Sequence, residues 1–186
     1  MFAEGFAAGG LGIGVLSEYL PGAGRDEIYL LMKEAGRLHA PVFVHARAAA
    51  LADADNLMTP VQELIADAAA TGAPVHLCHI GSKALSAIDM VLDMIDGARS
   101  RGVDVTTEVY PYDASSTAIG SALFNPGWQE RLAAKYEDIE WPPTGERLNA
   151  ESFARYRAQQ PGMAIVNHRI PEHTVTAAVA HPGVMI

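Results

Sequence analysis

Two short apolar stretches of the sequence each lead to a histidine. PVFVHA (41–46) contains His45, and PVHLCHI (74–80) contains His79. Both stretches have the composition of a buried β-strand, and both histidines fall near its carboxyl end. Neutral imidazoles from neighbouring strands, at matching depth, are typical ligands of zinc. The spacing predicts that His45 and His79 bind one metal ion, with a structural role for each histidine as the alternative.

The alternation of side chains along a strand ranks the residues near these histidines. Arg47 is expected on the same face as His45, because alternate side chains of a strand share a face. Cys78 and His76 are expected to point away from His79, toward the flanking helices. A buried structural role is the prediction for both of them.

Other polar residues are weaker candidates for a functional site. His168 follows the apolar stretch AIVN, which makes it a candidate third ligand that no motif supports. Lys83 lies where a helix is expected to begin, and this position explains it without a function. A polar loop either contacts a substrate or caps a turn; it consists of Ser115, Ser116 and Thr117.

The elements that must position these residues alternate between strand and helix. Apolar strands are expected at 10–16, 41–46, 74–80 and 103–112. Helical periodicity is found at 26–39, 59–72 and 82–102. The later strands begin about thirty residues apart, which is the length of a βα unit, and consecutive units imply parallel strands. The sequence predicts an α/β fold, either an open doubly wound sheet or a (β/α)8 barrel.

This alternation is interrupted in the second half of the chain. Residues 125–162 are expected to form two helices around a proline-containing loop, as an elaboration between units. The alternation is expected to resume with a strand at 163–170, a helix at 171–181 and a final apolar fragment at 183–186. We therefore treat 1–186 as one domain with an elaboration at 125–162.

Composition excludes several classes of protein. Of the 186 residues 49% are hydrophobic and 19% are charged, which is typical of a globular protein and not of a disordered one. The net charge of −9, without a run of basic residues, argues against nucleic acid or an anionic membrane as a partner. The one cysteine cannot form an internal disulfide, and no signal peptide or spanning segment is recognisable. We expect a soluble cytoplasmic protein.

Four stretches in sequence order resemble the D-aminoacylase family, the N-acyl-D-amino-acid deacylases of the metal-dependent amidohydrolase superfamily. They are GVLSEYLPG (14–22), VHAR (44–47), VHLCHIGS (75–82) and TTEVYPYDASSTAIGSALF (106–124). Within the family, the sequence is most similar to the N-acyl-D-glutamate deacylase branch, through CHI, TTEVYPY and DIEWPPTGERL (138–148). The resemblance covers nearly all of the chain.

The resemblance implies a distorted (β/α)8 barrel that uses zinc to hydrolyse the amide of an N-acyl-D-amino acid. His45 and His79 match zinc ligands of the family. Arg47 matches an arginine that lines the site, where its planar guanidinium would bind the substrate carboxylate. Tyr110 matches a substrate-contacting tyrosine near the scissile carbonyl, where a phenol would donate to a developing oxyanion. Zinc-bound hydroxide and a proton-transferring carboxylate complete the implied mechanism.

Parts of the family pattern have no counterpart in the sequence. No His-x-His pair is present, and the aspartate that acts as general base in the family would follow Ile186. The resemblance therefore implies an incomplete hydrolase barrel, without its first strands and the end of its last unit, that is inactive alone. Two other hypotheses stay open, an amidohydrolase acting on cyclic amides and a non-catalytic module that self-associates through open barrel edges. The preferred side chain, the acyl group and the number of metal ions are not predicted.

Overall fold

The computed structural model describes residues 2–20, 22–47 and 57–186, and its larger part is a parallel β-sheet. The strands, in spatial order, are β1 (Ile13–Leu16), β2 (Val42–His45), β3 (Val75–Leu77) and β4 (Val105–Thr107). Each neighbouring pair is parallel, as the alternation of strands and helices predicts. The helices that follow the strands are η1 (Ser17–Tyr19), α2 (Arg25–Leu38), α3 (Thr59–Thr71), α4 (Ile80–Ala84), η3 (Leu85–Ala87) and α5 (Ile88–Arg99).

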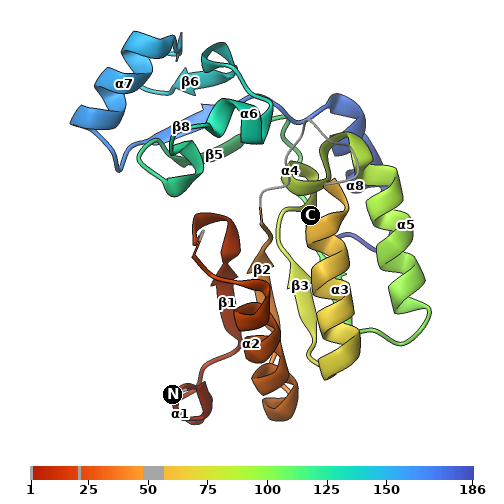
Figure 1. Cartoon of the computed structure of the whole chain (residues 1–186). Helices are drawn as coiled ribbons and strands as arrows, with labels where there is room; N and C mark the ends of the chain where they lie inside the picture. Colours follow the sequence, from red (N-terminus) through yellow and green to blue (C-terminus); the bar gives the residue numbers. More distant parts are fainter. Residues whose placement is uncertain (1, 21, 48–56) are drawn as a thin grey trace.

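The two faces of this sheet differ in what covers them. Helices α2, α3 and α5 cover one face of the sheet (Figure 1). Apolar side chains of the strands pack against these helices in one core cluster. The register places Val42 beside Val75 in this core. On the opposite face, here called the open face, Phe43 is 43% exposed and Leu16 is 56% exposed. A parallel sheet with helices on one face only has the arrangement of a section of barrel wall. Strands β1 to β4 and the helices that cover them are here called the wall.

Residues 115–167 form a second body, here called the lobe, beyond the carboxyl ends of the parallel strands (Figure 1). Its sheet has the order β5-β8-β6-β7, and its pairings are antiparallel. Its own core contains Trp128, Phe153 and Ile139. Its elements are β5 (Ser115–Ala118), η4 (Ala122–Phe124), α6 (Trp128–Leu132), η5 (Tyr136–Asp138), β6 (Ile139–Trp141), β7 (Glu146–Arg147), α7 (Ala150–Gln159) and β8 (Ala164–Asn167).

The sequence pattern predicted that the strand at 163–170 would be the next parallel strand of the wall, and this prediction is wrong. The stretch forms β8, which pairs antiparallel with β5 and β6. An apolar stretch followed by a helix looks the same in either setting, because its composition does not encode the direction of its partner.

The chain returns from the lobe to the parallel sheet through its last helix. Helix α8 (Glu172–Ala180) packs against α4 and α5. After it, the amide of Val109 donates to the carbonyl oxygen of Met185 at 2.9 Å, and the amide of Met185 donates to the carbonyl oxygen of Thr107 at 3.1 Å. This parallel bridge places the C-terminal fragment beside β4. The lobe is thus an insertion between β4 and the helix of the same βα unit.

The remaining helix precedes the wall. Helix α1 (Phe2–Ala7) contributes Phe2 and Phe6 to the edge of the main core. In the described part of the chain, no helix has both the length and the apolar character needed to cross a lipid bilayer.

Helix α3 contains Asp67, whose ionised carboxylate is less stable in the folded chain than in water. Burial raises the pKa of Asp67, the charge of Glu63 one turn earlier raises it further, and Oδ2 has no described hydrogen-bond partner. A carboxyl group with a raised folded-state pKa costs stability once the pH exceeds its ordinary value of 3.8. Asp67→Asn is expected to raise the free energy of unfolding by about 0.5 kcal/mol at pH 7.

Urea denaturation measures this gain, which should shrink as the pH is lowered toward the ordinary pKa of the group. Asp93→Asn on the exposed face of α5 is the matched control and should change stability little. Equal effects of the two substitutions would contradict the assignment to burial and to Glu63.

Candidate metal centre

The structure brings His45 and His79 together at the carboxyl ends of β2 and β3. Their ring centroids lie 4.4 Å apart, with the rings edge to face. Strand alternation does not explain why the two rings meet. Leu77 pairs in register with Val44, so an alternating strand would place His79, two residues later, on the face opposite His45. Strand β3 ends at Leu77, and His79 has a left-handed backbone with φ of 39°. That conformation turns the His79 side chain back toward His45.

A buried carboxylate and a buried ammonium group complete the surroundings of His45. Nε2 of His45 contacts Oε2 of Glu18, and Nζ of Lys83 lies 2.9 Å from the same nitrogen. Lys83 also donates to Glu18, and the side chains of Glu18 and Lys83 are each 9% exposed. Burial alone raises the pKa of Glu18, but the hydrogen bond to His45 and the charge of Lys83 outweigh it and lower that pKa to about 2. Glu18 is therefore ionised throughout the physiological range.

His79 is held in its neutral form. Burial, followed by the nearby His45 and Lys83, lowers the pKa of His79 to about 4. Oγ of Ser82 lies 3.1 Å from Nδ1 of His79 and orients the ring. Burial also lowers the pKa of Lys83, and the charge of Glu18 opposes that effect. A neutral imidazole is the protonation state that binds a metal ion.

A cavity of about 140 Å³ adjoins these groups. One side consists of the ends of the parallel strands, with His45, His79 and Tyr110, and the other side consists of residues of the lobe. The Tyr110 ring centroid lies 6.4 Å from that of His79. Burial raises the pKa of Tyr110, so its phenol keeps its proton and remains a hydrogen-bond donor. The structure therefore places Tyr110 at the same site as the two histidines.

Arg47, the predicted binder of a substrate carboxylate, does not line this cavity. Its guanidinium donates to the carbonyl oxygens of Ala23 at 2.7 Å and Gly24 at 3.0 Å, and to Glu63 at 3.3 Å. The reason is that β2 ends at His45, so strand alternation no longer fixes the direction of Arg47. Its contacts are those of a residue that holds the start of α2 to α3.

Arg169 is the arginine that lines the cavity, and sequence reasoning missed it. It lies two residues after the end of β8, just beyond the lobe, and is half-buried. Burial lowers the pKa of Arg169, and the charges of Asp138 and Glu18 oppose this effect. Within the described residues, its guanidinium has no hydrogen bond or ion pair. The sequence indicates only that Arg169 is a basic residue near the end of a predicted strand. That position points to the site only when the lobe is known to line the same cavity as the histidines.

The other sequence candidates separate into two groups. His168 forms a hydrogen bond of 2.9 Å with Glu140 inside the lobe, so it is not a third ligand of this centre. Ser115, Ser116 and Thr117 line the cavity, and Oγ1 of Thr117 lies 2.9 Å from the hydroxyl of Tyr19. These three residues form part of strand β5 and not a loop as expected, and they belong to the site.

Alternation counted back from His79 predicted that His76 points toward the helices, and this prediction is wrong. His76 pairs in register with Phe43, and the two rings lie 5.4 Å apart on the open face. The error came from counting alternation past the end of β3.

The ligand types around His45 are ones that zinc accepts, although the ligand atoms of His45, His79 and Glu18 do not all lie within 4.8 Å of one another. Two imidazoles and one carboxylate are ligand types that zinc accepts. Oε2 of Glu18 and Nε2 of His45 both contact the ammonium group of Lys83, which therefore lies where these two groups attract a cation. The residues that would bind the ion are His45 and His79, with Glu18 as an oxygen ligand after displacement of Lys83.

Comparison with solved structures places this arrangement in a known fold. The chain is similar to N-acyl-D-glutamate deacylase from Bordetella bronchiseptica, solved with zinc and a phosphonate inhibitor, with a TM-score of 0.65 and 24% identity over 88% of this chain. It is similar to D-aminoacylase with a TM-score of 0.68 and 21% identity over 97% of this chain. The chain has the fold of part of an amidohydrolase barrel. This confirms the predicted partial (β/α)8 fold.

The similarity covers only part of those enzymes. The chain spans 35% of the length of the N-acyl-D-glutamate deacylase and 39% of that of the D-aminoacylase. Another D-aminoacylase structure, with a TM-score of 0.69 and 19% identity, is described as having a binuclear metal centre. No protein-family model and no curated protein matches the sequence.

Proposed function

We propose that the chain is the metal-binding part of a zinc amidohydrolase that cleaves the amide bond of N-acyl-D-amino acids, including N-acyl-D-glutamate. One observation carries the proposal: His45 and His79 face each other beside a buried carboxylate at the carboxyl end of a parallel sheet. That end is where barrel enzymes build their active sites. The amidohydrolase fold supports the reaction class.

The residues around the cavity suit an acylated amino acid. Zinc held by His45 and His79 would supply hydroxide near neutral pH, because it lowers the pKa of a bound water. The protonated phenol of Tyr110 is placed to donate a hydrogen bond to the oxygen of the scissile carbonyl. Ser115 and Ser116 offer hydroxyl groups on the lobe side of the cavity. We assign the substrate carboxylate to Arg169, since its guanidinium is otherwise unpaired among the described residues.

Arg169→Gln is expected to weaken the binding of N-acetyl-D-glutamate by the zinc-loaded chain by about ten- to a hundredfold, which is the usual value of a charge-assisted hydrogen bond. Isothermal titration calorimetry measures the change. Arg47→Gln is the control, because Arg47 lies outside the cavity, and its dissociation constant should stay within about twofold of the original. If Arg47→Gln weakened binding and Arg169→Gln did not, the substrate carboxylate would have to be assigned to Arg47.

We further propose that the 186-residue chain alone does not turn over substrate. Among the described residues that line the cavity, the only carboxylate is Glu18. Its pKa of about 2, and its contacts with His45 and Lys83, make it a poor acceptor for a proton from water. A general base must therefore come from elsewhere.

The test of this function uses zinc-loaded protein expressed from the reading frame together with its flanking coding sequence. N-acetyl-D-glutamate, N-acetyl-L-glutamate and hydantoin are compared as substrates, with the 186-residue chain assayed in parallel. Hydrolysis of the D-compound alone, and only by the extended protein, is the expected result. Hydrolysis of hydantoin alone would assign the cyclic-amide alternative, and no hydrolysis at all would contradict the proposal.

The open face of the sheet favours one other candidate, a module that associates with a second copy of itself. Leu16 and Phe43 are exposed on this face, and β1 is an edge strand of the sheet among the described residues. Burying such a face, or pairing such an edge, is a common basis of association. Native mass spectrometry of the chain distinguishes the candidates, because a strict monomer would exclude this one.

A further inference from the structure

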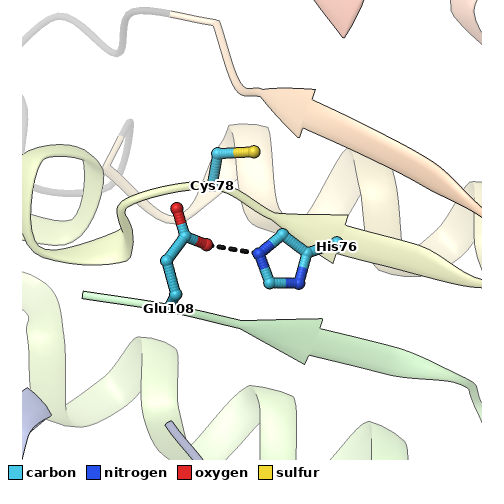
Figure 2. Close-up of side chains that lie close together, drawn as sticks. All are labelled: His76, Cys78 and Glu108. Carbon is cyan, nitrogen blue, oxygen red and sulfur yellow. Dashed lines mark hydrogen bonds and ion pairs between the residues drawn. The ribbon is translucent and has the colours of Figure 1, made fainter. Parts of the chain in front are cut away.

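A second group of potential metal ligands lies on the open face of the sheet, outside the cavity. It consists of His76, Cys78 and Glu108, whose ligand atoms all lie within 4.8 Å of one another (Figure 2). Within the described residues, no other three His, Cys, Asp or Glu side chains meet this condition. None of the three lines the cavity between the wall and the lobe.

The sheet holds these three side chains in place. Nδ1 of His76 lies 2.8 Å from Oγ1 of Thr106 on the neighbouring strand, and Nε2 forms a hydrogen bond with Oε2 of Glu108. The other carboxylate oxygen of Glu108 accepts a hydrogen bond of 2.6 Å from the amide of His79. The amide of Cys78 donates to the carbonyl oxygen of Val44 at 3.0 Å. Each ligand is thus fixed through its side chain or its backbone, as ligands of metal sites usually are.

The chemistry of this set selects a borderline divalent ion. Zinc binds one sulfur, one nitrogen and one oxygen ligand and accepts water in a fourth position, and cobalt can replace it in such a site. The side chains of His76 and Glu108 are 13% and 33% exposed, so an ion can reach them from the open face. We propose that His76, Cys78 and Glu108 bind a divalent zinc-type ion, at a site separate from His45 and His79.

Binding changes the protons in a defined way. The single ring proton of the neutral His76 imidazole moves from Nε2, which faces Glu108, to Nδ1, from which it donates to the hydroxyl of Thr106, and Nε2 is then free to bind the ion. The thiol of Cys78 loses its proton to solvent, so one proton leaves for each ion bound. Burial and the charge of Glu108 raise the pKa of Cys78 to about 11, so that proton is present before binding at neutral pH.

The proposal is tested by titrating the metal-free 186-residue chain with Co²⁺ and recording absorption. A thiolate bound to cobalt gives a charge-transfer band in the near ultraviolet, and Cys78 is the one cysteine of the chain. We expect this band in the native chain, its loss on unfolding in guanidinium, and its loss on addition of zinc. No band, or a band that persists in the unfolded chain, would overturn the proposal.

Variants identify the partners of Cys78. His76→Gln and Glu108→Gln, each checked for folding by circular dichroism, are expected to weaken cobalt binding at least about tenfold. Glu108→Gln keeps an oxygen that can accept from the amide of His79, so it tests ligation with little effect on the fold. An undiminished band in either folded variant would overturn the proposal.

A His45→Ala/His79→Ala double variant separates this site from the proposed hydrolytic centre. It is expected to keep the charge-transfer band, because neither residue belongs to the group of three ligands. Loss of the band in this folded variant would mean that Cys78 binds metal with those histidines, which would overturn the separate site. The band does not depend on any hydrolytic activity, so failure of the proposed function leaves this result unaffected.

Discussion

Lys83→Met is expected to lower the free energy of unfolding of the metal-free chain by about 3 kcal/mol. The substitution removes the ammonium group from a buried ion pair and leaves the carboxylate of Glu18 without its cation. Breaking a buried pair from one side usually costs about 3–5 kcal/mol. Urea denaturation in the presence of a chelator measures the loss. Lys33→Met, at an exposed position of α2, should have little effect.

Two further measurements separate the ion pair from simple packing. Lys83→Met/Glu18→Gln should recover most of the lost stability, because the uncompensated charge is removed with its partner. Zinc should stabilise Lys83→Met more than it stabilises the native chain, since the ion no longer has to displace an ammonium group. Equal stabilisation of the two proteins by zinc would contradict the view that Lys83 occupies the cation position.

His79→Ala is expected to weaken zinc binding at the centre by at least about a hundredfold, and His45→Ala by a similar factor. Each substitution removes one of two imidazoles whose ring centroids are 4.4 Å apart. An ion left with one imidazole and one carboxylate has too few protein ligands to compete with water. Competition with a chromophoric chelator measures the affinity, in a Cys78→Ser background so that the second proposed site does not contribute.

His173→Ala is the control for nonspecific histidine binding. His173 pairs with Asp89 on the surface, where its side chain is 63% exposed, and its removal should leave the affinity unchanged. Zinc affinity that is equal in His79→Ala and His173→Ala would rule out the centre. Neither the stability of Lys83→Met nor the hydrolytic activity enters this comparison.

Much of the wall was predictable because its signals are local. The apolar stretches around Val44 and Leu77 and the periodic segments between them predicted parallel strands and their helices. Residues Pro60 and Gly72 mark the two ends of α3; Gly72 adopts a left-handed conformation with φ of 70° that ends the helix. Local composition determines such elements, and the rule for consecutive βα units determines their direction.

The site was less predictable because it depends on geometry outside the strands. His79 reaches His45 through a left-handed residue, which a two-residue period does not describe. Arg169 lines the cavity and Arg47 does not, because Arg47 follows the end of β2 and bonds the backbone before α2, whereas Arg169 follows β8 at the cavity. The pairing partners of β8 are distant in sequence, and no alternation within 163–170 reveals them.

The point at which the lobe is inserted affects which parts of the site can change independently. The chain leaves the wall after β4 and returns to it through α8, which packs against α4 and α5 before Met185 pairs beside β4, so residues 115–167 are not part of the wall. The histidines belong to the wall, while Ser115, Ser116 and Thr117 belong to the lobe, which has a core of its own, and Arg169 follows directly after the lobe. A change in the lobe would therefore alter the lining of the cavity without altering the strands that carry the histidine pair.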